Sequence, residues 1–164
     1  MANDSIVKWQ NSYSVGVKLI DDQHMKLIEL TNKLFNSCVS GCEREESGGI
    51  FLKVFHEIID YVIYHFNTEE RVMERIGYLG YKLHKQEHSA FAGKVLNKAE
   101  EFNLGKVKNP LSFVYYLRDW VLQHIAVTDK KLGVYILDMK RRGDLQQIVL
   151  RAKRDYETNR VHVG

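Results

Sequence analysis

Apolar residues recur at three- and four-residue steps along four long stretches of the chain. That spacing places them on one face of an α-helix. It predicts helices over residues 50–75, 81–102 and 109–129, and a first helix that begins at Asp21 or Asp22 and ends at Gly41. Four amphipathic helices joined by short connections pack best as an up-down-up-down bundle. The sequence therefore predicts an all-α protein built on a four-helix bundle.

Two further segments flank the predicted bundle. Residues 1–20 lack a sustained helical stripe, so we expect an extended N-terminal arm that packs across the helices. After Asp129, two lysines and Gly133 predict a break in the helical pattern, followed by a short apolar run over residues 134–139. Residues 144–159 have the apolar spacing of an extra C-terminal helix.

The chain is expected to divide at residue 142. We predict a core domain over residues 1–142 and a helical extension over residues 143–164. From Lys140 onward the chain has seven lysines and arginines against three acidic residues. The extension is therefore basic, and it is a candidate docking segment for a protein partner.

Length and charge narrow the possible functions. A chain of 164 residues fits one domain with a sizeable core. The formal charge of +3 is small and argues against a dedicated nucleic-acid binder. No apolar run approaches the ~20 residues that span a bilayer, so we expect no membrane association. The first residues lack the basic and apolar segments of a signal peptide, and we expect a cytoplasmic protein.

The two cysteines do not suggest a disulfide framework. Cys38 and Cys42 are four residues apart at a predicted helix end. They are either one buried thiol and one loop thiol, or a redox-responsive pair.

Polar residues interrupt the apolar faces of all four predicted helices. His56 is nine residues from His65 and half a turn out of phase, so it should face solvent, and His162 lies in the tail. The polar residues that should face inward are His24, His65, Glu69, His84, His88, His124 and Asp129. A buried polar group must be paired, and a buried carboxylate especially so. This set therefore predicts bound cations.

The type of donor indicates the metal. Imidazole and carboxylate without thiolate suit iron, manganese or zinc. Seven donors are too many for one tetrahedral ion and suit two ions bridged by the carboxylates. His124 and Asp129 are five residues apart, out of phase on a regular α-helix, so the helix must end or widen there. The run from His84 to His88 also reads as the inverted zinc-protease motif, but that motif needs a much larger catalytic domain. Glu87 is then an outer or surface residue.

The seven residues resemble, in order and spacing, the full ligand set of the hemerythrins, in particular the bacterial hemerythrins. The resemblance covers about residues 7–139. The flanking residues that agree are Trp9, the runs at 15–17 and 20–24, Phe66, Glu70, Met73 and Trp120. Leu79 departs from the family, where proline is frequent in the second turn, and we expect it to alter the turn and not the site.

The resemblance implies a role for each residue of the set. It implies that His84, His88 and His124 bind one iron, that His24 and His65 bind the other, and that Glu69 and Asp129 bridge the two. It also implies an oxo or hydroxo group as a third bridge. Dioxygen would bind at the open position of the two-histidine iron and be held there as hydroperoxide.

Two further residues are implied to line the dioxygen pocket, Val121 and Trp120. Relatives often have a larger leucine at the position of Val121, so we expect a roomier pocket and faster autoxidation.

Three functions fit these expectations. The first is a non-enzymatic protein that binds dioxygen reversibly for carriage, storage or delivery. The second is a di-iron peroxidase or oxidase, although no obvious acid or base stands beside the open position. The third is a sensor of dioxygen, redox state or iron that acts through the C-terminal segment.

Overall fold

The computed structural model describes residues 5–39, 47–107, 109–148 and 150. It contains five α-helices over this part of the chain. They are α1 (Lys18–Val39), α2 (Ser47–Ile76), α3 (Tyr81–Asn103), α4 (Leu111–Gln123) and α5 (Lys130–Arg142). A π-turn, His124–Asp129, joins α4 to α5. The all-α prediction is confirmed.

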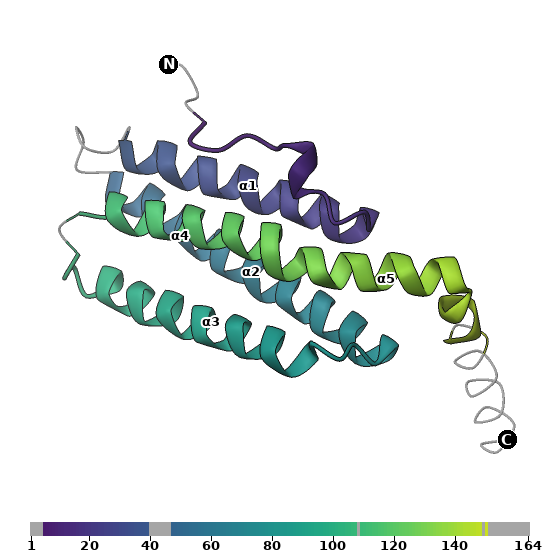
Figure 1. Ribbon diagram of the computed structural model, residues 1–164. Helices are drawn as coiled ribbons and strands as arrows, with labels where there is room; N and C mark the ends of the chain where they lie inside the picture. The colour runs from purple at the N-terminus through teal and green to yellow at the C-terminus, as the bar shows by residue number, and fades with distance from the viewer. Residues whose placement is uncertain (1–4, 40–46, 108, 149, 151–164) are drawn as a thin grey trace, which may run out of the picture.

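The helices form an up-down-up-down bundle (Figure 1). α1 and α3 run in one direction, and α2 and the rod made of α4 and α5 run in the other. α2 packs against α1 and α3, and α1 packs against α4. In Figure 1 the α5 end of the rod extends beyond the ends of α2 and α3. Four elements therefore surround one interior, as the apolar pattern predicted.

The first helix begins at Lys18, three or four residues before the two predicted starts, Asp21 and Asp22. At one of the two predicted starts, the Asp21 carboxylate holds the arm. Its Oδ1 accepts a hydrogen bond from Val15 N at 2.7 Å, and its Oδ2 accepts one from Ser14 Oγ at 2.7 Å. The contact with the arm therefore replaces a local cap and lets the helix extend further back. The predicted end at Gly41 lies outside the described residues.

The predicted break after Asp129 is wrong. Residues 111–142 form one uninterrupted rod, in which Gly133 is helical and buried. A Cβ at Gly133 would stand 2.3 Å from the carbonyl oxygen of Val15. Lys130 also donates a hydrogen bond to Ser14 O. Gly133 is therefore the point where the arm lies directly on the rod, and it does not end a helix.

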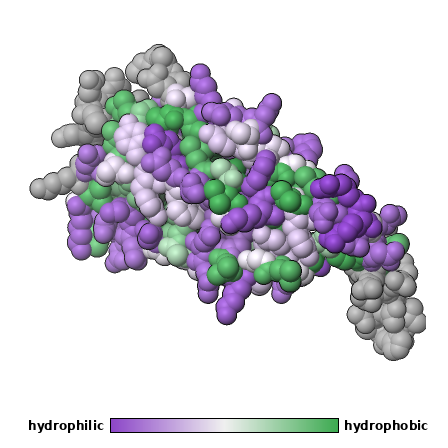
Figure 2. All heavy atoms as spheres, in the orientation of Figure 1, coloured by the Kyte–Doolittle hydropathy of each residue, from purple (hydrophilic) through white to green (hydrophobic). Residues whose placement is uncertain are grey.

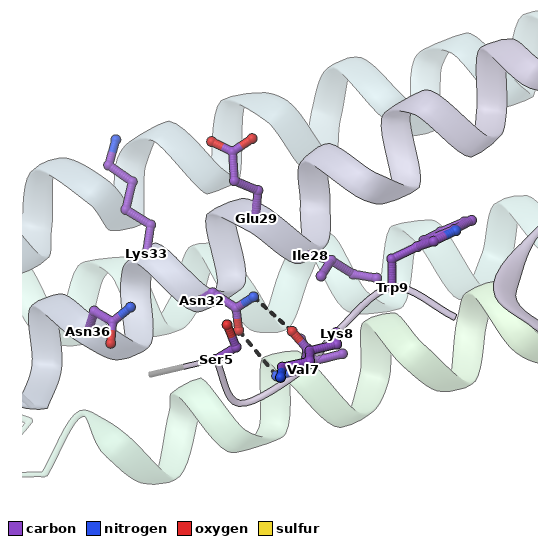
Figure 3. Close-up of a pocket in the computed structure, with 9 residues that line it drawn as sticks. All are labelled: Ser5, Val7, Lys8, Trp9, Ile28, Glu29, Asn32, Lys33 and Asn36. Carbon is purple, nitrogen blue, oxygen red and sulfur yellow. Dashed lines mark hydrogen bonds between the residues drawn. The ribbon is translucent and has the colours of Figure 1, made fainter. Parts of the chain in front are cut away.

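The arm is largely extended, as predicted, apart from a 3₁₀ turn over Asn11–Tyr13. On α1, the amide of Asn32 binds both backbone groups of Val7, with 3.2 Å from Val7 N to Oδ1 and 2.8 Å from Nδ2 to Val7 O. Figure 3 shows these two bonds at a surface cleft between the arm and α1. The arm is therefore fixed at both of its ends, on α1 and on α5.

The core consists of two apolar clusters with a polar layer between them. The larger cluster includes Leu30, Phe55, Phe91 and Leu117. The smaller one is formed by Val15, Ile20, Met73, Leu132 and Ile136. On α1, Ile20 of the smaller cluster and Leu27 of the larger one lie on either side of His24. The polar layer is therefore enclosed by apolar side chains above and below.

The surface in Figure 2 has hydrophilic and hydrophobic residues interspersed over the face shown. His56 is exposed, as predicted. Among the described residues, no helix combines the length and the apolarity that crossing a membrane requires. Gly143 ends α5 in the left-handed conformation, with a φ of 79°.

Several predictions concern residues at or beyond the edge of the description. Residues 144–148 and 150 are helical, and the rest of the predicted C-terminal helix, with His162, lies outside the described residues. The division at residue 142 stays a prediction. Cys38 is buried, while Cys42 lies outside the described residues, so a redox pair also stays untested.

Candidate metal centre

The seven polar residues predicted to face inward meet in one layer of the bundle. None of them is more than 4% exposed. Each main element contributes at least one, because the helical period returns these positions to the inner face. The contributors are α1 with His24, α2 with His65 and Glu69, α3 with His84 and His88, and the α4–α5 rod with His124 and Asp129.

The donor atoms fall into two groups that share two carboxylates. One group is Glu69, His84, His88, His124 and Asp129, and the other is His24, His65, Glu69 and Asp129. Within each group the donor atoms all lie within 4.8 Å of one another. The grouping separates three histidines from two, with Glu69 and Asp129 common to both. Two adjacent cations held by these groups would share both carboxylates.

Asp129 stands between histidines of both groups. Its Oδ1 lies 3.0 Å from His124 Nε2 and 3.1 Å from His84 Nε2, while its Oδ2 lies 3.1 Å from His24 Nε2. The two oxygens of one carboxylate therefore face different groups, which is the geometry of a bridge.

Glu69 is placed in the same way. Its Oε2 is 3.3 Å from Nε2 of both His84 and His88, and 3.8 Å from His65 Nε2. Its Oε1 is 3.9 Å from His24 Nε2. Glu69 therefore also reaches histidines of both groups.

The widened helix predicted between His124 and Asp129 is present. These six residues form a π-turn, in which residues five apart lie on the same face. His124 and Asp129 are both buried as a result, with 4% and 0% exposure. A regular α-helix would have turned one of them away from the layer.

Three of the histidines have a fixed orientation. His65 Nδ1 lies 3.0 Å from Gln23 Oε1, His88 Nδ1 lies 3.2 Å from Glu70 Oε1, and His124 Nδ1 lies 3.3 Å from Glu87 Oε2. Amide and carboxylate oxygens only accept hydrogen bonds, so each Nδ1–H must donate. In a neutral imidazole the lone pair is then on Nε2, which faces the layer.

This orientation calls for a positive charge inside the layer. The Nε2 atoms of His88 and His124 are 3.0 Å apart. If both rings are neutral, two lone pairs face each other at that distance and repel. A cation between them removes the repulsion and uses both lone pairs.

The same layer contains nearly all the unpaired polar atoms of the interior. In the described part of the chain, Tyr116 Oη is the one buried side-chain nitrogen or oxygen outside the layer that lacks a hydrogen-bond partner. The others belong to His24, His65, Glu69, His84 and Asp129. An unsatisfied buried polar group costs roughly 1–3 kcal/mol. Metal ions bound by these atoms would satisfy them, and imidazole with carboxylate is a donor set that suits iron.

The electrostatics of the layer are mixed. Burial lowers the pKa of His65 to about 4, so that ring is neutral at neutral pH. Burial also acts on His84, but the Asp129 and Glu69 carboxylates outweigh it and raise its pKa to about 9. Burial acts to raise the pKa of both Glu69 and Asp129, and the Asp129 carboxylate acts in the same direction on Glu69, yet the surrounding imidazoles hold both pKa values below the ordinary value. Both carboxylates are therefore charged and available to cations.

Aromatic rings cover the three-histidine side of the layer. Phe66 stacks on His88 with ring centroids 3.7 Å apart, and Trp120 stacks on His124 at 4.5 Å. Trp120 is stacked in turn on Phe91 at 3.6 Å. Val121 is 3% exposed and belongs to the larger apolar cluster. The role of Trp120 and Val121 in a dioxygen pocket stays a prediction.

The sequence does not predict which residues orient the histidines, apart from an outer position as one alternative for Glu87. Gln23 and Glu70 agree with the family only as flanking residues, and Glu87 is predicted to be an outer or surface residue, of which the structure shows the outer position behind His124. Thr128 Oγ1 donates to Glu87 Oε2 at 2.8 Å. Gln23, Glu70 and Glu87 each lie next to a member of the layer in the sequence, and this adjacency is the signal that could have pointed to them.

Leu79 is 93% exposed in the α2–α3 turn.

The chain is similar to known proteins in sequence and in fold. The family described as "Hemerythrin HHE cation binding domain" matches residues 15–136. The chain belongs to the hemerythrin family. Hemerythrins are non-heme di-iron proteins that bind oxygen and are not typically enzymes.

Curated hemerythrins align over most of the chain. A bacteriohemerythrin of Methylococcus capsulatus is 32% identical over 74% of this chain and 88% of its own length. One of Stenotrophomonas maltophilia is 31% identical over 77% of this chain and 78% of its own length. A myohemerythrin of Sipunculus nudus is 30% identical over 75% of this chain and 88% of its own length.

Solved hemerythrin structures share the fold. A wild-type hemerythrin crystal structure superposes with a TM-score of 0.72 at 29% identity, covering 78% of this chain and 95% of the other. Part of this chain therefore has no counterpart in that structure.

Proposed function

We propose that this hemerythrin binds two iron ions in the polar layer and binds dioxygen reversibly, for carriage, storage or delivery. The observation that carries the proposal is the pair of donor groups that share Glu69 and Asp129. A single-ion site would not need two shared carboxylates, and a purely structural cluster would pair its polar atoms. Here most of them have no hydrogen-bond partner.

Each residue has a distinct task in this proposal. The three-histidine position is held by His84, His88 and His124, and the two-histidine position by His24 and His65. Glu69 and Asp129 bridge the two positions and balance part of the positive charge of two Fe²⁺ ions in an apolar interior. An oxo or hydroxo third bridge and dioxygen as the external ligand belong to the same proposal. When bound, two Fe²⁺ ions would supply the electrons that dioxygen takes up.

The protein contributes a dry and poorly acidic enclosure. The two apolar clusters lie on either side of the layer, and all its donor residues are buried. The buried Thr31 on α1 donates its hydroxyl proton to Leu27 O at 2.8 Å, so that proton is already engaged. Exclusion of water and of mobile protons favours release of unchanged dioxygen over reduction.

Spectroscopy of the iron-loaded protein tests the proposal. The protein is loaded with Fe²⁺ without oxygen, exposed to dioxygen and then deoxygenated, while the absorption spectrum and the iron content are followed. We expect two iron ions per chain and a charge-transfer band that appears with dioxygen and disappears on its removal. Absence of an oxygen-dependent band, or one iron per chain, would contradict the proposal.

A pair of histidine variants supplies the matched control. His124→Gln should lower the iron content, because His124 lies in the three-histidine group. His56→Gln should retain it, because His56 is exposed on α2. An enzyme would behave differently from a carrier: dioxygen would be consumed over repeated cycles, and the spectrum would not return to its starting form.

A further inference from the structure

Three polar residues connect the helices in a regular way around the polar layer. We call Gln23, Glu70 and Glu87 the outer acceptors. Gln23 on α1 accepts from His65 on α2, Glu70 on α2 accepts from His88 on α3, and Glu87 on α3 accepts from His124 at the start of the π-turn. Each helix therefore orients a histidine of the next helix in the chain.

The sequence positions explain this regularity. Gln23 precedes His24, Glu70 follows Glu69, and Glu87 precedes His88. One residue along an α-helix turns the side chain by about 100°. α2 runs opposite to α1 and α3 (Figure 1). One residue forward on α2 therefore turns the side chain in the same sense around the bundle as one residue back on α1 or α3. All three acceptors therefore point toward the next helix.

The outer acceptors differ in charge between the two cation positions. Behind the two-histidine position, His65 faces a neutral amide, and His24 Nδ1 has no hydrogen-bond partner among the described residues. Behind the three-histidine position, His88 and His124 each face a carboxylate. An imidazole whose N–H donates to a carboxylate is a more basic ligand than one that donates to an amide.

Both carboxylates are held by a second contact. Lys85 Nζ lies 2.8 Å from Glu70 Oε2, and this cation offsets part of the charge of Glu70. Glu87 is bound by the neutral hydroxyl of Thr128 at 2.8 Å. Thr128 lies within the π-turn, so the element that brings Asp129 into the layer also fixes Glu87. The Glu87 side chain is 50% exposed and, among the described residues, forms no ion pair with a lysine or arginine, in contrast to Glu70.

We propose that Glu87 and Glu70 are positioning residues that make the three-histidine position the preferred location of the more oxidised metal. The inference rests on the proposed di-iron function. The hydrogen bonds fix His88 and His124 with Nε2 toward the metal, and the negative charge behind them stabilises the higher oxidation state. The neutral Gln23 leaves the two-histidine position, where dioxygen is proposed to bind, without this bias.

Glu87→Gln separates charge from geometry. Its amide oxygen can still accept from His124 and Thr128, but the negative charge is gone. We expect the iron content and the melting temperature to be unchanged. The midpoint potential should rise by roughly 30–60 mV for a one-electron step, which corresponds to a change of about three- to tenfold in the ratio of oxidised to reduced protein. Potentiometric titration followed by absorption spectroscopy measures this.

Glu100→Gln is the matched control. Glu100 is also exposed on α3 but lies thirteen residues further along, roughly 20 Å from Glu87. At that distance, salt at ordinary concentrations screens the charge of Glu100. The midpoint potential of the Glu100→Gln variant should therefore equal that of the unmodified protein. If Glu87→Gln shifts the potential no more than Glu100→Gln, the proposal is overturned.

Iron affinity tests the positioning role separately. Glu87→Ala removes the acceptor, and we expect iron affinity in a chelator competition to fall by roughly 10–100-fold. Glu87→Gln should restore most of it. Equal affinity in Glu87→Ala and the unmodified protein would refute the positioning role. If the unmodified protein fails to bind two irons, the proposed function itself has failed, which distinguishes the two results.

Discussion

Val121 lies one helical turn before His124 on α4, where its side chain is almost fully buried. The family resemblance implies that this position lines the space in which dioxygen is held. The valine side chain is one methylene shorter than the leucine that relatives often have at this position. The size of one side chain should therefore control how easily the oxygenated form is lost.

We expect Val121→Leu to slow autoxidation without changing the iron content. One additional buried methylene corresponds to about 0.8 kcal/mol, or roughly a fourfold change in rate if it acts fully on the loss of the oxygenated form. Decay of the oxygen-dependent absorption band at constant temperature measures the rate. Val95→Leu enlarges a buried valine on α3 two turns past His88 and serves as the control. Equal decay in Val121→Leu and the unmodified protein would contradict the expectation.

Helical periodicity could predict which elements exist and which residues line their inner faces. His65 and Glu69 share a face by spacing alone, and the five-residue step from His124 to Asp129 required the widened turn that is found. The contacts between elements could not be predicted in this way. Gln23 and Glu87 point about 100° away from the inner face, so their partners depend on how the helices are arranged around the layer.

Gly133 illustrates the same limit at the level of a helix. Glycine is a poor helix former, so its presence after two lysines favoured a break. In the structure the helix continues, because the missing side chain lets the arm lie on α5. The sequence of α5 alone contains no information about Val15. Only the folded arrangement shows that this glycine is required by a neighbour and not by the backbone of its own helix.

Gly133→Ala should destabilise the protein by displacing the arm. Its Cβ would stand 2.3 Å from Val15 O and 2.7 Å from Val15 Cβ, and the obstructing atoms include backbone. Overpacking typically costs roughly 1–3 kcal/mol, and the better helix propensity of alanine returns about 1 kcal/mol. We expect the melting temperature to fall by a few degrees, measured by circular dichroism.

Gly93→Ala is the control for this substitution. Gly93 lies within α3, and a Cβ there meets no atom within 4 Å. Only the propensity gain remains, so this variant should melt slightly above the unmodified protein. If both glycine variants melt at a higher temperature, the arm is not held against Gly133.

At the scale of the whole molecule, the polar layer is a weakness in the metal-free protein. It separates two apolar clusters that would otherwise form one continuous core. Two buried carboxylates and five imidazoles occupy the centre, and several of their atoms have no hydrogen-bond partner. Metal binding should therefore contribute directly to the stability of the fold, because a ligand that binds the folded state alone stabilises it.

Removal of the metal should lower the melting temperature, and Fe²⁺ should restore it. At a free metal concentration of 100 times the dissociation constant, binding to one site stabilises the folded state by about 2.7 kcal/mol. For a domain of this size each kcal/mol corresponds to roughly 2–4 °C, so a decrease of roughly 5–11 °C is expected. Thermal unfolding of chelator-treated protein, without oxygen, before and after addition of Fe²⁺ measures this. Mg²⁺ prefers oxygen ligands and should restore little, because five of the seven donors are imidazoles. A stripped protein that melts at the original temperature would show that the layer is stable without metal and would remove the energetic basis of the di-iron site.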